Sequence, residues 1–458
     1  MATQNHFDLL VLGSGQSGNP LAGAFADAGK RAAVVERALV AGTCINYGCT
    51  PTKTMVASAR RAYDARTSSD LGIEIPEFKV NLERIRQRKR DLVAQFRAGN
   101  ERRFENGSPE LIRGEASFVG PHEVRVELKE GGQQTLTASA IVIDTGLSPL
   151  IPKIPGLEGV PYMDNVSLME LGAVPEHLVI LGGGYLAVEF GQMFHRFGSK
   201  VTMLQSGAHI LEREDDDVSD ALARVLREDG IEVRTGSQVD AVSGAKGVIS
   251  VHVKGGEPVQ GSHLLVAVGR KPNTEALNLK AAGVKTDEHG FVQVNEKLET
   301  NIPGVYATGD VKGGPAFTHI SYDDYRILRD NLLHGANRTT EGRLVPNVVY
   351  TDPQLGRVGL TEREARAQGR PYKLAQMPMK SVARANEIGE TRGFMKALVD
   401  PGSGQILGAA VLGAEGGEIM SMLQIAMMGK LTYKDMVEAI FAHPAYSESL
   451  NNLFNKLD

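Results

Sequence analysis

Two cysteines, Cys44 and Cys49, are the residues of this sequence best suited to redox chemistry, and they are its only cysteines. Two neighbouring thiols can form a disulfide that acts as a two-electron relay. The thiolate is the reactive form, and a helix N-terminus or a nearby cation lowers a cysteine pKa. The segment 48–54 resembles a helix start, with Pro51 suited to the first turn and Lys53 as the cation. By spacing alone, two unrelated core cysteines would explain the pair equally well.

A thiol relay also needs a proton acceptor, and His443 has the most suitable surroundings among the 11 histidines. It lies in the segment Phe441-Ala-His443-Pro-Ala-Tyr-Ser-Glu448. A carboxylate beside an imidazole holds it in one tautomer and stabilises its charged form. Taken alone, a surface histidine near a helix-capping Ser-Glu pair is the simpler interpretation.

The elements that would position these residues follow one pattern, found twice: an apolar strand, a glycine cluster, a helix and a second strand. The first copy has a strand at 9–12, then Gly13, Gly15 and Gly18, a helix at 20–28 and a strand at 32–35. The second copy has a strand at 178–181, then Gly182, Gly183 and Gly184, a helix ending near Arg196 and a strand at 201–204. Each copy is typical of a βαβ unit in which glycines and a helix N-terminus receive a pyrophosphate. Two such sites predict hydride transfer between two cofactors, or one cofactor and one regulator.

The residue after each second strand indicates the nucleotide. Glu36 lies about 20 residues beyond the first glycines, where an acidic side chain accepts a hydrogen bond from a ribose hydroxyl. This suits an adenosine without a 2′-phosphate, such as that of FAD. Gln205 and Ser206 take this place in the second copy, and a neutral pair leaves both NADH and NADPH open.

Length and composition exclude several classes of protein. The 458 residues suggest about three domains. A net charge of −5 gives no electrostatic case for nucleic acid or an anionic membrane. No apolar run approaches the roughly 20 residues that cross a bilayer, and the polar start lacks a secretory pattern, so we expect a cytoplasmic protein.

Residues 80–105 predict a polar, solvated helix. Strands near 345–350, 394–399 and 407–412, with helices near 415–428 and 434–440, predict a final α+β domain.

Taken together, these segments resemble the class I pyridine nucleotide–disulfide oxidoreductases, the branch of dihydrolipoamide dehydrogenase, glutathione reductase and mercuric reductase. The most specific match is Gly42-Thr43-Cys44-Ile-Asn-Tyr-Gly-Cys49-Thr-Pro-Thr-Lys53, with four residues between the cysteines. The resemblance implies an α/β fold with two Rossmann-like dinucleotide-binding domains and a C-terminal α+β dimerisation domain. The implied domains are residues 1–150 with 273–342 for FAD, 151–272 for NAD(P) and 343–458 for dimerisation.

The resemblance also implies the residues that contact the two cofactors. Those for FAD are Gly13, Gly15, Gln16, Ser17, Gly18, Glu36, Arg37, Gly42, Thr43, Lys53, Gly114, Ala116, Thr145, Gly146, Asp310 and Thr318. Those for NAD(P)H are Gly182, Gly183, Gly184, Tyr185, Leu186, Glu189, Gln205, Ser206 and Gly269. No resident metal is implied.

The mechanism that the resemblance implies is a relay from nicotinamide through FAD to the Cys44–Cys49 disulfide and then to a small disulfide substrate. Cys49 would be the sulfur next to the flavin, and Cys44 would attack the substrate. His443, oriented by Glu448 and supplied by the other subunit of a homodimer, would be the base for Cys44. Lys53 would lie near the flavin and pair with Glu189.

Departures from the family leave alternatives open. Mercuric reductases carry a further C-terminal cysteine pair and lack the His-Pro…Glu motif, whereas this sequence has the motif and no further cysteines. Yet the segments 15–20 and 49–53 look closer to mercuric reductases than to glutathione reductase. A metal-ion reductase of mercuric type and a dithiol dehydrogenase running in the oxidising direction are the alternatives within the enzymes. A slow redox sensor that holds FAD is a third, against which Lys53, Glu189 and His443 argue.

Overall fold

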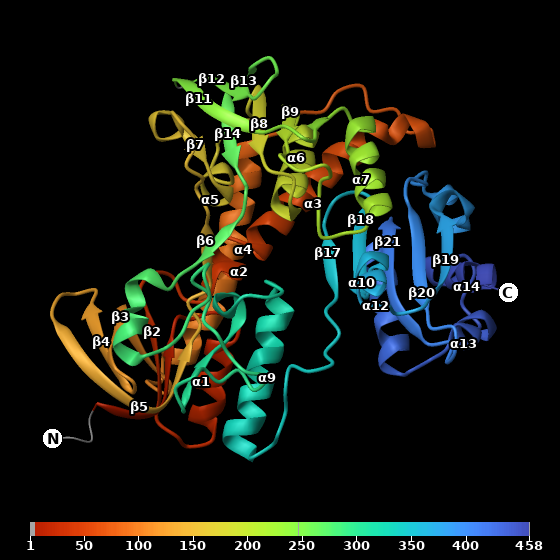
Figure 1. Cartoon of the computed structure of the whole chain (residues 1–458). Coiled ribbons are helices and arrows are strands. Elements are labelled where there is room, and N and C mark those ends of the chain that lie inside the picture. The colour runs from red at the N-terminus through yellow and green to blue at the C-terminus, as the bar shows by residue number, and fades with distance from the viewer. Residues whose placement is uncertain (1–4, 246, 458) are drawn as a thin grey trace. The chain divides into compact units, whose positions relative to one another are not determined.

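The computed structural model describes residues 5–245 and 247–457, and the chain divides into two compact units (Figure 1). Unit 1 comprises Met1–Thr54, Gln87–Leu150 and Arg270–Arg343, and unit 2 comprises Met55–Arg86, Ile151–Gly269 and Leu344–Asp458. Both units mix helices and sheets, so the predicted α/β class is confirmed. The predicted borders of the three domains stay a prediction.

Unit 1 is built on a parallel sheet with the strand order β3–β2–β1–β5–β16. The strands are β1 (His6–Leu12), β2 (Ala32–Glu36), β3 (Glu110–Gly120), β5 (Gln133–Ile143) and β16 (Val305–Ala307). β1 is apolar from Leu9 to Leu12 because both faces of a parallel sheet are covered. Leu10 and Leu12 therefore join one core cluster, while Leu9 and Val11 join another.

Strands β3 and β5 are long because each serves two pairings. The first residues of β3 pair with β2, and from Gly114 onward β3 pairs with β4 (Glu123–Leu128) in an antiparallel meander that β5 completes. Helices α1 (Gly18–Asp27) and α9 (Thr318–His334) contact each other, and their apolar residues join the cluster of Leu9 and Val11 (Figure 1). The predicted first helix is confirmed and begins two residues earlier than expected.

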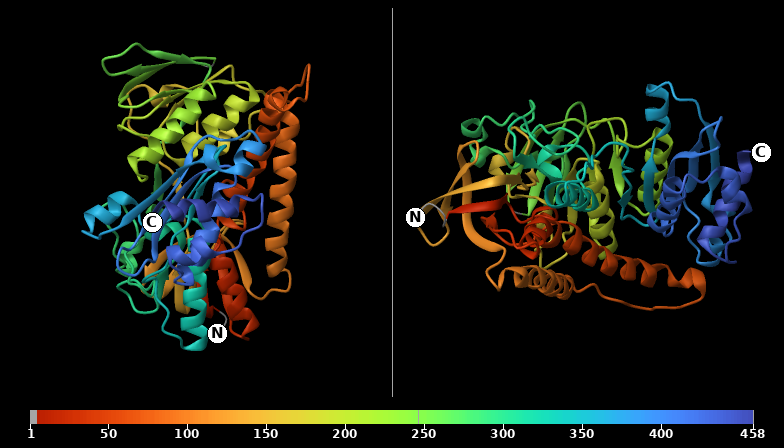
Figure 2. Two further views of the ribbon diagram at one scale, coloured as in Figure 1. Left: turned by 90° about the vertical axis from the view of Figure 1, so that its right-hand side faces the viewer. Right: turned by 90° about the horizontal axis from the view of Figure 1, so that it is seen from below.

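Unit 2 contains a second parallel sheet, with the order β10–β9–β8–β14–β7. The strands are β7 (Tyr162–Met163), β8 (His177–Leu181), β9 (Lys200–Leu204), β10 (Glu232–Arg234) and β14 (His263–Val266). Helices α6 (Tyr185–Phe197) and α7 (Asp216–Glu228) cover one face. The meander β11 (Val239–Ala245), β12 (Val248–Val253) and β13 (Val259–Gly261) covers the other, as Figures 1 and 2 show. Both predicted strand–glycine–helix–strand segments are thus confirmed.

The last part of unit 2 is an antiparallel sheet with the order β17–β18–β21–β20–β19. The strands are β17 (Asn347–Val349), β18 (Gln354–Gly359), β19 (Lys373–Pro378), β20 (Phe394–Val399) and β21 (Ile406–Gly413). Both faces of β21 are buried, since Ala409 and Val411 pack with α12 (Gly416–Met428) and α14 (Ser449–Phe454) while Ala410 and Leu412 join the cluster of α6 and α7. This explains why β21 reads as a continuous apolar run rather than an alternating one.

Helix α13 (Tyr433–Glu438) ends two residues before the predicted 440. The side-chain amide of Asn451 donates to the carbonyl oxygens of Met436, Val437 and Ala439, at 2.8, 3.0 and 2.9 Å. These are carbonyls that a continuing helix would use for its own hydrogen bonds, so the contact with α14 ends the helix.

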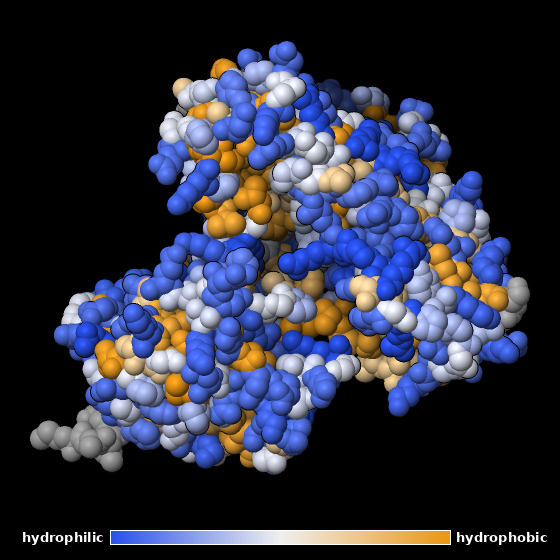
Figure 3. All heavy atoms as spheres, viewed as in Figure 1, coloured by the Kyte–Doolittle hydropathy of each residue, from blue (hydrophilic) through white to orange (hydrophobic). Residues whose placement is uncertain are grey.

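The predicted polar helix over 80–105 is α4 (Leu82–Glu101), in which Arg84, Arg88 and Arg90 are exposed and Lys89 is buried. Hydrophilic side chains cover most of the face seen in Figure 3, with hydrophobic ones in separate patches. Among the described residues, no helix is both long enough and apolar enough to cross a bilayer.

Candidate active site

The two cysteines are brought together by a turn in unit 1 that joins one short helix to the first residues of the next. Cys44 lies on α2 (Gly42–Asn46), and Cys49 is the first residue of α3 (Cys49–Thr67). The turn is tight: a Cβ on Gly48 would lie 3.1 Å from the carbonyl oxygen of Thr43, so a larger residue would crowd α2. The thiols hydrogen-bond to each other, and Thr318 Oγ1 lies 3.3 Å from Cys49 Sγ. Thr318, predicted as an FAD contact, therefore touches the cysteine pair directly.

The two thiols lie in different surroundings. The hydrogen bond with Cys49, followed by burial and by repulsion between the two charged sulfurs, raises the pKa of Cys44. Cys49 is exposed at the N-terminus of α3, where the positive end of a helix favours a thiolate. A thiol with a raised pKa is a poor nucleophile at neutral pH, so Cys44 needs a base before it can attack a substrate.

The first glycine cluster fits the pyrophosphate of a dinucleotide. Gly13 has a φ of +100°, and a Cβ there would lie 2.4 Å from the backbone oxygen of Asp144. A Cβ on Gly42 would lie 2.9 Å from the Cα of Gly15, so the two predicted FAD segments touch through bare backbone. Ser17 Oγ is buried at the start of α1 and has no hydrogen-bond partner among the described residues. An orphaned hydroxyl at a helix N-terminus is suited to bind phosphate oxygen.

Glu36 ends β2 as predicted, and its carboxylate is held in place. Its Oε2 accepts hydrogen bonds from Ser14 N at 3.1 Å and Ser14 Oγ at 2.6 Å, and its Oε1 accepts one from Ala38 N at 2.7 Å. A fixed carboxylate with lone pairs to spare can accept a ribose hydroxyl. Next to it, Arg37 pairs with Glu115 at 3.1 Å on the surface. The sequence did not reveal Ser14, because its partner lies 22 residues away.

Other predicted FAD residues meet in unit 1 although they are distant in sequence. Thr145 Oγ1 donates to the carbonyl oxygen of Asn273 at 2.8 Å, and Asn273 Nδ2 donates to that of Thr145 at 2.8 Å. Asp310 pairs with Arg270 at 3.2 Å; burial raises the pKa of Asp310, and Arg270 opposes the shift. The backbone N–H of Asn273 also donates to the carbonyl oxygen of Gly146 at 3.0 Å. The segment of Thr145 and Gly146 is therefore joined to the segment that follows Gly269.

Three further predicted FAD residues have structural partners. Gln16 Nε2 donates to the carbonyl oxygen of Ala41 at 3.1 Å and so links the glycine turn to the segment before α2. Gly114 and the buried Ala116 lie in β3, where a Cβ on Gly114 would lie 2.4 Å from the backbone oxygen of Glu127. Close packing of β3 against β4 is therefore a second reason why position 114 requires a glycine.

The second glycine cluster lies in unit 2 at the start of α6. A Cβ on Gly182, which has a φ of +114°, would lie 2.4 Å from the carbonyl oxygen of Ala267. A Cβ on Gly183 would lie 3.1 Å from the Gln205 side chain, so Gln205 and its neighbour Ser206 lie at the turn as predicted. Gly184 precedes the helix, and Tyr185 and Leu186 begin it.

Tyr185 is held by two residues that the sequence did not reveal. Its hydroxyl donates to Glu214 Oε1 at 3.1 Å, and Arg357 Nε lies 3.0 Å from Glu214 Oε2 as an ion pair without good hydrogen-bond geometry. Burial and the charge of Glu214 raise the pKa of Tyr185 to about 12. Burial likewise raises the pKa of Glu214, and Arg357 opposes the shift. Tyr185 therefore stays a neutral donor with a fixed hydroxyl.

Two predicted catalytic groups have clear partners within unit 2. Glu189 is buried, and its Oε1 accepts a hydrogen bond from Tyr350 N at 2.9 Å. His443 is exposed, and its Nδ1 lies 3.0 and 2.9 Å from the two carboxylate oxygens of Glu448. The carboxylate favours the proton on Nδ1 and leaves Nε2 as the acceptor. The pairing of Glu189 with Lys53, a residue of unit 1, stays a prediction, as does that of His443 with Cys44.

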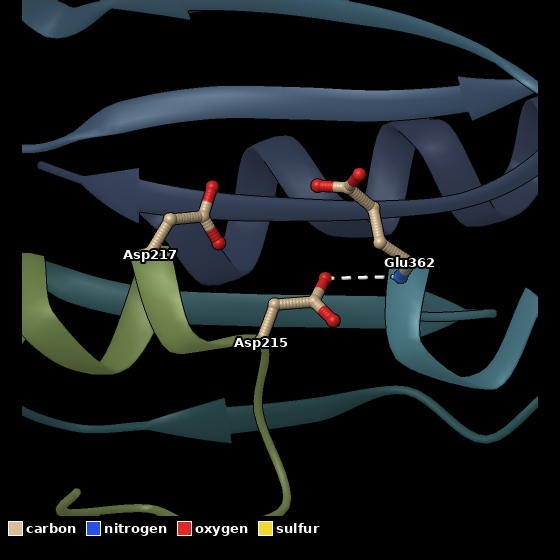
Figure 4. Close-up of side chains that lie close together, drawn as sticks. All are labelled: Asp215, Asp217 and Glu362. Carbon is tan, nitrogen blue, oxygen red and sulfur yellow. Dashed lines mark hydrogen bonds between the residues drawn. The ribbon is translucent and has the colours of Figure 1, made fainter. Parts of the chain in front are cut away.

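A cluster of three carboxylates lies away from these groups, in unit 2. Oxygen atoms of Asp215, Asp217 and Glu362 lie within 4.8 Å of one another, and Figure 4 shows Asp215 just before α7, Asp217 on α7 and Glu362 at the start of α10 (Glu362–Ala367). Lys396 Nζ on β20 lies 2.8, 2.7 and 3.0 Å from them. Burial lowers the pKa of Lys396, but its three hydrogen-bonded carboxylates raise it overall. The ammonium group thus takes the place that a metal ion would occupy.

Comparisons with known proteins agree across the whole chain. Residues 7–324 match the family model described as pyridine nucleotide-disulphide oxidoreductase, and residues 345–454 match the dimerisation domain of that family. The chain is 38% identical over 98% of its length to the probable pyridine nucleotide-disulfide oxidoreductase RclA of Escherichia coli, of which it covers 99%. It is 35% identical over 97% of its length to a mercuric reductase of Staphylococcus aureus, of which it covers 81%.

A third relative is a dihydrolipoyl dehydrogenase of Thermus scotoductus. It is 34% identical to this chain, and the match covers 97% of this chain and 96% of the relative. Among solved structures, the Cu(II) complex of the HOCl-induced flavoprotein disulfide reductase RclA from Escherichia coli has a TM-score of 0.91. That match has 36% sequence identity and covers 99% of this chain and 100% of the other.

Proposed function

Because the chain belongs to the pyridine nucleotide-disulphide oxidoreductases, we propose that it is a homodimeric NAD(P)H:disulfide reductase that acts on a small disulfide. The family membership confirms the resemblance seen in the sequence, and with it FAD as cofactor and NAD(P)H as electron donor. FAD, when bound, carries two electrons from the nicotinamide to the cysteine pair. A cytoplasmic location is part of the proposal, because a reducing compartment keeps such a pair available for turnover.

One observation carries the proposal: Cys44 and Cys49 lie together at the turn between α2 and α3, where the hydrogen bond with Cys49 and burial raise the pKa of Cys44. A base must therefore remove the Cys44 proton before this sulfur attacks. The His443–Glu448 pair has the right chemistry, since Glu448 holds Nδ1 and leaves Nε2 to accept a proton. In the proposal the base comes from the second subunit, through the dimerisation domain at residues 345–454.

The proposed reaction balances as NAD(P)H + H⁺ + RSSR → NAD(P)⁺ + 2 RSH. Cys44 thiolate attacks one substrate sulfur, forms a Cys44–S–S–R bond and releases RS⁻, which takes the proton from His443. Cys49 thiolate then attacks Cys44 Sγ, restores the Cys44–Cys49 disulfide and releases the second RS⁻, which takes the remaining H⁺ of the equation from solvent. Each exchange breaks one S–S bond and forms another, as thiol–disulfide exchange requires.

Mixed dimers test whether the base crosses the interface. Homodimers of Cys44→Ser and of His443→Gln are each expected to lack activity. A heterodimer with one variant in each subunit recombines a normal Cys44 with a normal His443 at one of its two sites. It should therefore recover about half of the wild-type disulfide reductase activity. A heterodimer as inactive as its parents would place the base in the same subunit as Cys44 and contradict the proposal.

We expect His443→Gln to lower the turnover number for disulfide reduction about 10²–10⁴-fold at pH 7. The rate of the variant should then rise with pH, because the raised pKa of Cys44 keeps its thiol protonated until hydroxide replaces the lost base. Steady-state rates from pH 6 to pH 10 measure this. His289→Gln, at an exposed histidine elsewhere, is the matched control and should behave as wild type. A wild-type pH profile in His443→Gln would exclude His443 as the base.

A metal-ion reductase is the second candidate, favoured by the similarity to mercuric reductases and to the RclA structure that is a Cu(II) complex. Against it, the sequence has no cysteines beyond Cys44 and Cys49 to deliver a soft metal ion. Anaerobic NADH and NADPH oxidation with lipoamide, glutathione disulfide and cystine, and in parallel with Hg(II) or Cu(II), separates the two. Metal-dependent turnover that exceeds every disulfide rate and persists in Cys44→Ser would favour the metal ion.

A further inference from the structure

Asp144, which directly follows β5, lies inside the first glycine turn. Its Oδ2 accepts a hydrogen bond at 2.8 Å from the backbone N–H of Gly18, the first residue of α1. A Cβ on Gly15 or on Gly18 would lie 2.7 Å from the same oxygen, and a Cβ on Gly309 would lie 3.1 Å from Oδ1. The carboxyl group is thus enclosed by both segments predicted to bind FAD, and Asp144 is only 7% exposed.

The charged groups around Asp144 do not neutralise it. Asp310 and Asp324 face it from the segment after β16 and from α9. The cations nearby are engaged elsewhere, Arg270 with Asp310 at 3.2 Å, and Lys312 and Arg343 with Asp324 at 3.2 and 2.8 Å. Burial, and less strongly Asp310 and Asp324, raise the pKa of Asp144 well above its usual range, and hydrogen bonds from the backbone of Gly18 and Gly15 oppose the shift.

A pyrophosphate at this turn brings further negative charge to the same helix N-terminus. An ionised Asp144 would repel it and would compete for the N–H groups of α1. A neutral carboxylic acid still accepts the hydrogen bond from Gly18 and adds an O–H donor for a phosphate oxygen or a water molecule. We propose that Asp144 carries a proton when FAD is bound and closes the amino end of α1 as a neutral acid.

This inference rests on FAD occupying the glycine turn and does not depend on disulfide turnover. By linkage, protonation of Asp144 strengthens FAD binding, and FAD binding strengthens protonation of Asp144. FAD affinity is therefore highest when the pH is below the pKa of Asp144 in the apoprotein. Affinity is then lost as the pH rises through that pKa. The raised pKa also means that Asp144 stabilises the fold only at low pH, and this contribution is lost as the pH rises above its unfolded value of about 3.9. Asparagine, neutral at every pH, removes both effects.

Infrared difference spectroscopy of the holoenzyme tests the proposal directly. The wild-type minus Asp144→Asn spectrum at pH 7 should contain the carbonyl stretch of a protonated carboxylic acid, and that band should shift in heavy water. Asp27→Asn, an exposed aspartate in the last turn of α1, is the matched control and should not remove the band. Absence of the band from the wild-type holoenzyme would overturn the proposal, whatever the enzyme does with disulfides.

Release of FAD on dilution, followed by flavin fluorescence, gives a second readout. Asp144→Asn should hold FAD at pH 7 within about threefold of wild type and should release no more of it at pH 9.5, whereas wild type and Asp27→Asn should lose affinity up to tenfold per pH unit above the pKa. A loss of more than tenfold in Asp144→Asn at pH 7 would show that the charge is needed and would contradict the proposal. If this variant does not fold, FAD release from wild type decides the question: an affinity that stays constant from pH 7 to pH 9.5 would overturn the proposal.

Discussion

Cys49→Ser is expected to lose disulfide reductase activity by about 10³-fold or more while it keeps its FAD. The reason is that a serine hydroxyl cannot form a disulfide with Cys44. Electrons that reach the cofactor therefore have no disulfide to reduce within the protein. Because the FAD residues of unit 1 are unchanged, NAD(P)H should still reduce the cofactor, and oxygen should slowly reoxidise it. Stopped-flow reduction by NADH or NADPH, together with steady-state assays on disulfides, measures both halves of the reaction.

Cys44→Ser is the matched comparison, because it removes the other sulfur of the pair. It should lose the same disulfide activity but keep the Cys49 thiolate, which no longer shares a hydrogen bond with the Cys44 thiol. A long-wavelength band between thiolate and flavin should therefore be present in Cys44→Ser and absent in Cys49→Ser. The band in the opposite variant would reverse the roles assigned to the two sulfurs, and full activity in Cys49→Ser would refute the relay.

Lys396→Met is expected to cost about 3–5 kcal/mol of folding free energy, since it leaves the buried carboxylates of Asp215 and Glu362 without their cation. Lys396 is 1% exposed and pairs with Asp215, Asp217 and Glu362 at 2.7–3.0 Å. Urea unfolding followed by circular dichroism measures the loss. Lys434→Met, at an exposed lysine of α13, is the control and should stay within about 0.5 kcal/mol of wild type.

The pH dependence of Lys396→Met follows from the same contacts. Burial raises the pKa values of Asp215 and Glu362, but hydrogen bonds, including those from Lys396, lower both overall. A lowered carboxyl pKa gives stability that is present at neutral pH and lost as the pH falls through the folded value. Without Lys396, protonation of these carboxyls should instead stabilise the folded protein. The difference in unfolding free energy between variant and wild type should therefore shrink from pH 7 to pH 4. A difference that stays constant or grows would contradict this account.

The two nucleotide-binding segments could be predicted because their determinants are local. An apolar strand, a glycine turn and a helix lie within about 30 residues of each other, and β1, α1 and β2 follow this order closely. The Cys44–Cys49 turn and the His443–Glu448 pair are equally local, with partners five residues apart.

The features that the sequence did not reveal depend on contacts between distant residues. Asp144 meets Gly18 across 126 positions, and Lys396 meets Asp217 across 179. Neither position stands out by type, because a lysine in a strand and an aspartate after one are ordinary surface residues until the fold buries them. The Glu214–Arg357 pair behind Tyr185 was missed for the same reason.

The central claim is that electrons from NAD(P)H arrive at the Cys44–Cys49 pair. The most direct measurement is anaerobic titration of the oxidised holoenzyme with NAD(P)H, followed by alkylation and mass spectrometry of both cysteines. The relay predicts no alkylation before the titration and, after NAD(P)H has reduced the pair, alkylation of Cys44 and Cys49 together. Addition of a substrate disulfide should then return both to the unreactive state. A flavin that is reduced while the Cys44–Cys49 disulfide stays closed would contradict the account.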